Sequence, residues 1–390
     1  MSTKINRRNW LKSSLMAASS LTLAPHLAWS SSARKASGSV IWEIEHPSYY
    51  WDAAPTLKAK LNANENPYGP SESVKRAISE AVAVGNRYGH SDAAVLIDMI
   101  AEKEGVTPDH IMLGPGSTDL LEKTAISRFI KGGNIVSADP SYMSLINTAQ
   151  AIGADWKAVP LTADYAHDLP AMEAAVDSKT QLVYVCNPNN PTGSITEPNA
   201  LRNFCAKVSE KTPIFVDEAY LEFLDDPEAN SMVDLVRKGK DVIVARTFSK
   251  IHSMAGLRIG YVVAKPERIK SITDMVRSTM GLCVTSIKGA AASMADGDFC
   301  AECKTLNTAA RDYVCAELEK MGYKYIPSYT NFVIFPLHKD TVGEAFMKSM
   351  TAKGVGVRLY SFNNEPWCRV SVGTMPEMQL FTEVFKQVTA

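Results

Sequence analysis

An α/β fold with a mostly parallel sheet is predicted by three features of the 390-residue chain. From about Ser71 onward, short runs of β-branched residues alternate with amphipathic stretches, which is the pattern of strands connected by helices. Hydrophobic residues make up 46% and charged residues 21% of the sequence, which is typical of a folded globular protein. At roughly 100–200 residues per domain, the length predicts two domains with room for a cleft between them.

The expected elements of the first domain alternate between strand and helix. Strands are expected at residues 110–113, 135–138, 181–186, 214–217, 242–247 and 259–263, and helices at 117–129, 142–152 and 198–209. A mostly parallel sheet flanked by helices follows from this order.

The pattern changes after about Val284, which indicates a second and smaller α+β domain. A helix-rich stretch runs to about residue 321, and strands near 331–335, 356–359 and 367–372 precede a last helix from residue 376. The stretch 57–85 comes before the main series and is expected to pack with this second domain. The predicted division is a signal peptide at 1–33, an N-terminal arm and part of the small domain at 34–85, a large cofactor-binding domain at 86–283, and the small domain at 284–390.

The first 33 residues are expected to be a targeting segment. Arg7-Arg8 precedes an uncharged, moderately apolar stretch from residue 13 to 33, which is too polar to span a membrane. The adjacent arginines resemble a signal peptide of the twin-arginine type, which implies export of a folded protein to the periplasm or beyond. The protein stays cytoplasmic if this signal is not functional, and a disordered basic leader is the alternative interpretation.

The charge balance excludes several partners. The formal net charge is −1, from 41 basic and 42 acidic residues, and no basic block contains interleaved aromatic residues, so nucleic acid is not expected as a partner. Removal of residues 1–33 changes the charge to −5, and no stable membrane association is expected afterwards. Cys300-x-x-Cys303 is open to a redox or zinc interpretation, but no second pair completes a site, and no metal is predicted.

The candidate catalytic and ligand-binding residues follow three of the predicted strands. A turn at 187–193, Asn-Pro-Asn-Asn-Pro-Thr-Gly, follows the strand 182–186; Asp217 and Tyr220 follow the next strand; Lys250 and Arg258 follow the strand 242–247. The carboxyl ends of parallel strands are where α/β sheets bind ligands. Pyridoxal 5′-phosphate uses all of these groups: a lysine for its aldehyde, an acid for its protonated ring nitrogen, and hydroxyls with an arginine for its phosphate.

With these motifs the chain resembles a fold-type-I pyridoxal-phosphate aminotransferase of class I/II, and most closely the histidinol-phosphate aminotransferase branch. The matching motifs run from Leu-Asn-Ala-Asn-Glu-Asn-Pro at 61–67 to Arg-Val-Ser-Val-Gly-Thr at 369–374. The resemblance implies a large domain with a mostly parallel sheet of the seven-stranded type, a smaller α+β domain, and transfer of an amino group between an amino acid and a 2-oxo acid.

The resemblance also implies roles for individual residues. Lys250 matches the Schiff-base lysine, which also moves the substrate proton, and Asp217 matches the partner of the ring nitrogen. Asn190 and Tyr220 match the pair that hydrogen-bonds the phenolic oxygen of the ring, and Tyr142 matches the aromatic residue that stacks on the ring. The phosphate is expected at the helix start formed by Gly116, Ser117 and Thr118, together with Thr247, Ser249 and Arg258.

The remaining matches concern the substrate and a second subunit. Arg369 matches the arginine that grips the substrate carboxylate as a bidentate fork, Arg358 matches a second arginine at the substrate end, and Asn64 is expected on the substrate side of the cofactor. Tyr88 matches a residue that reaches the cofactor phosphate of the neighbouring subunit, which implies a homodimer with shared active sites.

Two departures from the family pattern bear on the substrate. The helix start reads Gly-Ser-Thr-Asp at 116–119 where the family usually has Gly-Ala-Asp-Glu, which leaves the backbone amides in place. The Tyr-x-Pro-Gly segment that is common in histidinol-phosphate enzymes is absent before Leu61. Together with the expected export, this absence favours a different amino acid as the substrate.

Other reaction classes remain as alternatives. The cofactor core does not separate a transaminase from a decarboxylase, lyase or racemase of the same fold, although a carboxylate held by Arg369 favours proton removal. A non-catalytic exported binding protein is disfavoured because Lys250 and Asp217 are both present. A dinucleotide site is disfavoured because Gly-Pro-Gly at 114–116 is not completed by a glycine at position 119.

Overall fold

The computed structural model describes residues 41–43, as backbone only, and residues 56–277, 281–362 and 364–389. Its largest element is a seven-stranded sheet in which β9 runs antiparallel to its two neighbours and the other neighbouring strands are parallel. In spatial order the strands are β3 (Ile111–Gly114), β9 (Gly260–Val263), β8 (Val242–Thr247), β7 (Ile214–Asp217), β6 (Thr180–Cys186), β4 (Asn134–Asp139) and β5 (Asp155–Pro160). The predicted fold class is confirmed.

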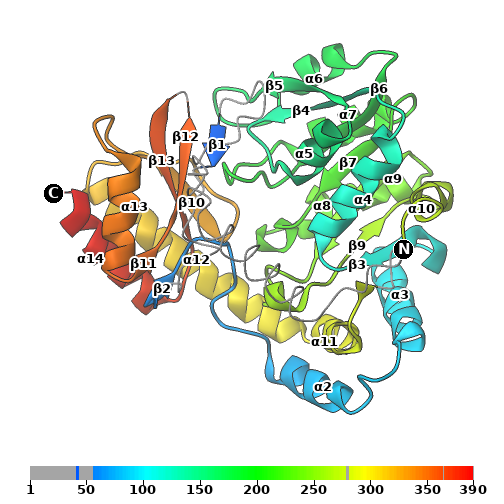
Figure 1. Cartoon of the computed structure of the whole chain (residues 1–390), viewed down its shortest axis with the longest axis horizontal. Coiled ribbons are helices and arrows are strands. Elements are labelled where there is room, and N and C mark those ends of the chain that lie inside the picture. The colour runs from blue at the N-terminus through cyan, green and yellow to red at the C-terminus, as the bar shows by residue number, and fades with distance from the viewer. Residues whose placement is uncertain (1–40, 44–55, 278–280, 363, 390) are drawn as a thin grey trace, which may run out of the picture.

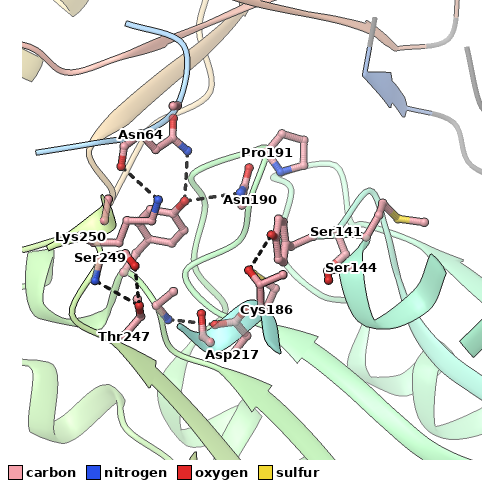
Figure 2. Close-up of a pocket in the computed structure, with 18 of the residues that line it drawn as sticks. Asn64, Ser141, Ser144, Cys186, Asn190, Pro191, Asp217, Thr247, Ser249 and Lys250 are labelled. Atoms are coloured by element: carbon pink, nitrogen blue, oxygen red, sulfur yellow. Dashed lines mark hydrogen bonds between the residues drawn. The ribbon is translucent and has the colours of Figure 1, made fainter. Parts of the chain in front are cut away.

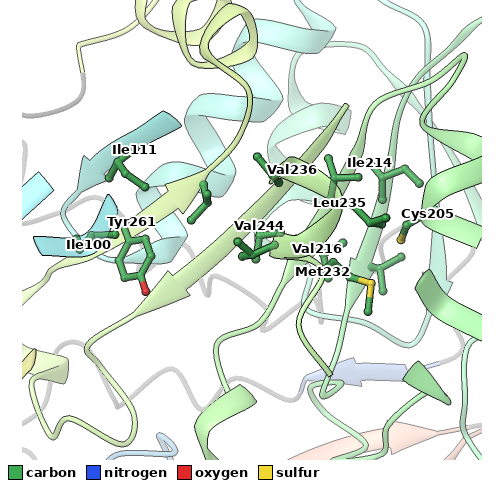
Figure 3. Close-up of a cluster of buried hydrophobic side chains, with 14 of the residues drawn as sticks. Ile100, Ile111, Cys205, Ile214, Val216, Met232, Leu235, Val236, Val244 and Tyr261 are labelled. Carbon is green, nitrogen blue, oxygen red and sulfur yellow. The ribbon is translucent and has the colours of Figure 1, made fainter. Parts of the chain in front are cut away.

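The central strands are continuous apolar runs because helices cover both faces of this sheet. Along β7, Ile214 and Val216 face one hydrophobic cluster, shared with Ile100 and Cys205, while Phe215 between them faces the opposite cluster. Figure 3 shows the first of these clusters, with side chains from the sheet meeting side chains from the helices. Alternation of successive side chains therefore divides one run of apolar residues between two cores.

Helices fill the connections and cover the sheets. The α-helices are α2 (Glu72–Val82), α3 (His90–Glu104), α4 (Ser117–Phe129), α5 (Ser144–Ala151), α6 (Leu169–Ala175), α7 (Pro198–Val208), α8 (Pro227–Asn230), α9 (Val233–Arg237), α10 (Pro266–Thr273), α11 (Val284–Met294), α12 (Gly297–Lys320), α13 (Gly343–Ala352) and α14 (Met375–Thr389). Short 3-10 helices lie at Pro108–His110, Leu221–Phe223 and Ala255–Leu257.

A second, four-stranded antiparallel sheet forms the other lobe of the molecule. Its spatial order is β1 (Ile41–Glu43), β12 (Arg358–Phe362), β13 (Glu365–Ser371) and β10 (Phe332–Pro336), and a separate parallel pair joins β11 (Val355–Gly356) to β2 (Ala59–Lys60). Figure 1 shows this sheet with α13 and α14 on one side of the molecule and the large sheet on the other, with α12 running from one lobe toward the other.

The segment that follows β2 connects the two lobes. Leu61 donates its N–H to Gly356 and accepts from the N–H of Ser371, so the chain is fixed to the small sheet just before it enters the pocket. Further on, α2 packs against α11, where Ile78 lies close to the bare backbone of Gly289. The predicted domain limits stay a prediction, because this arm contacts elements from both lobes.

The predicted elements agree with the structure apart from a few boundaries. β5 was not expected, because its residues are partly exposed at the edge of the sheet and alternate with polar ones. Helix α5 begins at Ser144 and not at Tyr142, and the strand expected at 356–359 is divided at Val357 between β11 and β12. Among the described residues, no helix is long and apolar enough to cross a membrane. The predicted signal peptide and residues 49–55 lie outside the described residues.

Candidate active site

A pocket of about 580 Å³ opens at the edge of the large sheet where its parallel strands end. This volume lies in the range of small-molecule sites. Of the residues predicted from the sequence, the pocket wall includes Asn64, Ser117, Thr118, Tyr142, Asn190, Asp217, Tyr220, Thr247, Ser249, Lys250, Arg258, Arg358 and Arg369. Figure 2 shows several of these side chains around the cavity, with Asp217 and Thr247 at neighbouring strand ends.

Lys250 lies just beyond β8 and extends into the pocket. Its Nζ donates to the backbone carbonyl of Asn64 at 3.1 Å and lies 5.4 Å from the centre of the Tyr220 ring. Burial lowers the pKa of Lys250 to about 8, and the charge of nearby Arg369 acts in the same direction. A substantial fraction of the amine is therefore neutral near physiological pH, as a nucleophile toward a carbonyl requires.

Asp217 is the last residue of β7 and is only 2% exposed. One carboxylate oxygen accepts the N–H of Ala219 at 3.1 Å, and the other lies 3.5 Å from the hydroxyl of Tyr184. Burial raises the pKa of Asp217 to about 6, and the charge of Lys250 offsets only part of this effect. A cationic group bound beside Asp217 would stabilise the buried carboxylate.

Two side-chain amides converge on the hydroxyl of Tyr220. Asn64 Nδ2 donates to it at 3.1 Å and Asn190 Nδ2 at 3.4 Å. A phenol has one proton and accepts at two positions, so both acceptor positions of Tyr220 are used. The proton of Tyr220 is therefore available to an acceptor in the pocket.

Arg369, on β13 of the small lobe, lines the pocket and is held by several contacts. Its guanidinium lies between the rings of Phe332 and Tyr360, 5.2 and 5.3 Å from their centres. Nη1 donates to Asn190 Oδ1 at 2.7 Å, whereas the buried Nε has no hydrogen-bond partner among the described residues. Because Nε is enclosed, an anion that enters the pocket would meet the Nη1 and Nη2 side of the guanidinium, which lines the pocket.

An anion site lies at the start of α4. Gly116 precedes this helix, and no side chain caps its first N–H groups. Thr247 and Ser249 share a hydrogen bond of 2.9 Å, and Arg258 Nη1 lies 3.4 Å from the Ser249 hydroxyl. Helix N–H groups, two hydroxyls and a guanidinium together are well suited to a phosphate.

Glycine is favoured at position 116 by the backbone conformation there, and Arg258 lies directly against its backbone. Gly116 has φ +85°, and a Cβ atom there would be 2.3 Å from Nη2 of Arg258. A side chain at this position would therefore displace the arginine and fill part of the anion site.

Tyr142 lines the pocket between the helix start and the strand ends. Its hydroxyl lies 3.1 Å from the hydroxyl of Thr118, and burial raises its pKa, so the ring stays neutral. An aromatic wall, a buried acid, a reactive amine and an anion site thus surround one cavity. These groups fit pyridoxal phosphate.

Tyr88 is the one predicted side chain that lies apart from the described pocket wall. It is 78% exposed and does not line the pocket of its own chain. Gly116 contributes through its backbone, as described above.

Several residues of the site were not predicted. Tyr184, Cys186 and Tyr360 are buried residues within strands, where the sequence pattern indicates only core packing. Ser371 and Asn331 contact Asn64, and both contacts join segments far apart in the chain. The only signal in the sequence was that Tyr184 and Cys186 lie on the strand that precedes the turn at 187–193.

The cysteine pair lies behind the loop that carries Lys250. Cys300 Sγ is 3.4 Å from Nδ1 of His252, and Cys303 packs against Ile251. Burial raises the pKa of both thiols, that of Cys300 to about 12, so neither is a reactive thiolate at neutral pH. In the described part of the chain, no three metal-binding side chains cluster.

Comparison with known proteins gives a consistent result. Residues 56–385 match the family model described as aminotransferase class I and II. The chain is 37% identical over 325 residues to histidinol-phosphate aminotransferase 1 of Cupriavidus pinatubonensis, covering 83% of this chain and 86% of that protein. It is 34% identical over 333 residues to histidinol-phosphate aminotransferase of Moorella thermoacetica, covering 85% of each.

A solved structure agrees with these relatives. The structure of histidinol-phosphate aminotransferase from Sinorhizobium meliloti in complex with pyridoxal-5′-phosphate superposes with a TM-score of 0.79 at 28% identity, covering 85% of this chain and 91% of that one.

Proposed function

This chain belongs to the class I and II aminotransferases, and from that membership we propose a role for each group in the pocket. The protein is a pyridoxal-phosphate-dependent transaminase that moves an amino group between an amino acid and a 2-oxo acid. Bound pyridoxal phosphate supplies an aldehyde that carries the amino group and a cationic ring that withdraws electrons from the substrate α-carbon.

Lys250 would hold the cofactor covalently through its amine. Once free, its Nζ would act as the base that takes the proton from the substrate α-carbon. The lowered pKa supports both tasks, because each begins with a neutral amine.

The surrounding side chains hold the charges of the reaction. Asp217 would stabilise the positive ring nitrogen. Tyr220 and Asn190 would hydrogen-bond the ring oxygen, while Asn190 and Asn64 also donate to the hydroxyl of Tyr220. The N–H groups at 116–118 together with Thr247, Ser249 and Arg258 hold the phosphate, and Tyr142 supports the ring.

The observation that carries the proposal is the state of Arg369. It is buried between the rings of Phe332 and Tyr360 and lines the pocket, and its Nη1 is bonded to Asn190 Oδ1 at 2.7 Å. The pocket side of such a guanidinium fits a substrate carboxylate bound as a bidentate pair. A carboxylate held there favours breaking the bond to hydrogen at the α-carbon, and Arg358 lies on the pocket wall for the substrate's other end.

The substrate is tested with a panel of amino donors. The relatives are named for histidinol phosphate, whereas the absent Tyr-x-Pro-Gly segment favours a different amino acid here. Cofactor-loaded protein is mixed with single amino acids and with histidinol phosphate, and the visible absorbance and the products are followed. Conversion of the cofactor to its amine form by an amino acid is expected. If CO₂, an eliminated group or the racemised substrate is the only product, the proposed transamination is wrong.

We also propose a homodimer with shared active sites. Tyr88 is exposed within the connection between α2 and α3, and Val84 in the same connection and Val95 in α3 are exposed apolar residues. Inactive Tyr88→Ala and Lys250→Ala proteins are mixed after dissociation. Shared sites predict that about a quarter of wild-type activity returns, because each mixed dimer regains one intact site. No recovery from verified mixed dimers would contradict the proposal.

For localisation we propose export in the folded state, supported by Arg7-Arg8 and the uncharged stretch at 13–33. Cell fractionation of the native chain and of an Arg7→Lys, Arg8→Lys variant tests this. The native chain is expected in the periplasm in processed form and the variant in the cytoplasm. Cytoplasmic location of both would overturn the proposal.

A further inference from the structure

Asn64 is a buried residue that contacts both catalytic side chains. It is 1% exposed and has φ +52°, a left-handed conformation that is uncommon outside glycine. Its side chain donates to Tyr220, and its backbone carbonyl accepts from Lys250. Both contacts depend on the orientation of the side-chain amide and the backbone carbonyl of Asn64. These groups contact Ser371 on β13 and Asn331 just before β10.

Ser371 on β13 contacts both the backbone and the side-chain amide of Asn64. Its hydroxyl oxygen accepts the backbone N–H of Asn64 at 2.8 Å and donates its proton to Asn64 Oδ1 at 2.9 Å. In this arrangement the single proton of the hydroxyl is directed at Oδ1, and Nδ2 faces Tyr220 at 3.1 Å. Without this hydroxyl, a turned amide would present its oxygen to Tyr220.

Asn331, which precedes β10, holds the other end of Asn64. Its Nδ2 donates to the carbonyl oxygen of Asn64 at 3.0 Å, the same atom that accepts from Lys250 at 3.1 Å. Asn331 is itself 2% exposed, and its own carbonyl accepts the N–H of Val372 at 2.7 Å. The backbone carbonyl oxygen of Asn64 therefore accepts one hydrogen bond from Asn331, and its second acceptor position faces Lys250.

We propose that Ser371 and Asn331 are positioning residues of the active site, which act through Asn64 to orient the hydroxyl of Tyr220 and the free amine of Lys250. This inference rests on the roles proposed above for Lys250 and Tyr220. When Lys250 is released by the substrate, one N–H of its neutral amine donates to the Asn64 carbonyl. The lone pair and the second N–H then lie away from this carbonyl, and Lys250 lines the pocket in which the α-proton is taken.

The role proposed for Asn331 is tested with a matched pair of alanine variants, one at Asn331 and one at Asn307. Asn307 is a second buried asparagine whose Nδ2 donates to a backbone carbonyl, that of Thr330 at 3.3 Å, and it lines the same small cavity as Asn331. Asn331→Ala should slow the half-reaction with an amino acid about tenfold and raise its α-deuterium isotope effect, with KM nearly unchanged. It should also slow capture of pyridoxal phosphate by the cofactor-free protein.

Asn307→Ala should lower thermal stability to a similar degree and leave the isotope effect and capture rate unchanged. Equal behaviour of the two folded variants would overturn the role of Asn331. Should Asn331→Ala not fold, Asn331→Ser is measured in its place.

The role proposed for Ser371 is tested in the protein with bound pyridoxal phosphate, by titrating its visible absorbance with pH. Ser371→Ala should move the midpoint upward by about 0.5 pH units or more, because a misdirected Tyr220 is a weaker donor to the ring oxygen. Ser371→Thr should restore the midpoint. Ser137→Ala, which removes a buried hydroxyl that accepts from Trp156 Nε1 at 2.8 Å, should leave it unchanged.

An unmoved midpoint in folded Ser371→Ala would overturn the role of Ser371. Failure of the premise is distinguishable, because pyridoxal phosphate would then not become attached to Lys250 on borohydride reduction even in the native protein.

Discussion

Arg369 and Ser371 lie two residues apart on β13, and each is bonded to one of the two asparagines that donate to Tyr220. Arg369 Nη1 reaches Asn190 Oδ1 at 2.7 Å, and the hydroxyl of Ser371 reaches Asn64 Oδ1 at 2.9 Å. Alternate residues of a strand share a face, which brings both side chains to the same side of the small sheet. The orientation of a hydroxyl in one lobe is thus set by a strand of the other.

Replacement of Lys250 by alanine is expected to abolish turnover. The nucleophile and the base are the same amine, so both halves of the reaction are lost. The visible band of the lysine-bound cofactor should also be absent, whereas Lys270→Ala, at an exposed helical position, should change neither. Full activity of Lys250→Ala would show that the mechanism is wrong.

The capture of pyridoxal phosphate by cofactor-free protein is expected to accelerate with rising pH and to level off above about 8. Burial lowers the pKa of Lys250 to about 8, and only the neutral amine attacks an aldehyde, so the rate follows its deprotonation. Stopped-flow absorbance between pH 6 and pH 10 measures the midpoint. A midpoint near the ordinary lysine value would contradict the buried environment of the amine.

Asp217→Asn is expected to stabilise the cofactor-free protein while impairing catalysis. Burial raises the pKa of this carboxyl from 3.8 to about 6, so the folded state binds its proton more tightly than the unfolded state does. Ionisation of Asp217 therefore lowers the free energy of unfolding of the native protein. This loss is absent below about pH 4, grows up to about pH 6 and reaches at most about 3 kcal/mol above it.

Thermal unfolding of the native protein and of Asp217→Asn, both without cofactor, tests the direction of this change in stability. The variant should have the higher Tm at pH 7.5 and no advantage at pH 4. With pyridoxal phosphate bound the advantage should disappear, because the ring nitrogen then pairs with the native carboxylate.

Arg369→Ala is expected to raise KM for every carboxylate substrate by about 10- to 150-fold, the cost of one charged hydrogen-bonding interaction of about 1.5–3 kcal/mol. Arg369→Lys should recover only part of this loss, because an ammonium does not form a bidentate pair. Arg358→Ala is the matched comparison, and its effect should vary with the far end of the substrate. A KM that is unchanged in Arg369→Ala would remove the role assigned to this arginine.

The sequence by itself determined the order of elements and most of the chemistry of the site. Continuous apolar strands between amphipathic helices require a sheet covered on both faces, and parallel strands place their carboxyl ends at one edge. Asp217, Asn190 and Lys250 follow such strands directly, so their convergence was predictable from local pattern. Their hydrogen-bond partners were not, because no local pattern records which side chains meet across the cleft.

Only the tertiary structure decided how the small lobe completes the pocket. Ser371 and Asn331 look like ordinary strand residues in the sequence, and Tyr360 looks like core. Ser371 and Asn331 join the site through Asn64, in contacts that span about 270 to 310 residues of chain, and Tyr360 joins it through Arg369. The lowered pKa of Lys250 has the same origin, since desolvation depends on what packs around an amine and not on its neighbours in sequence.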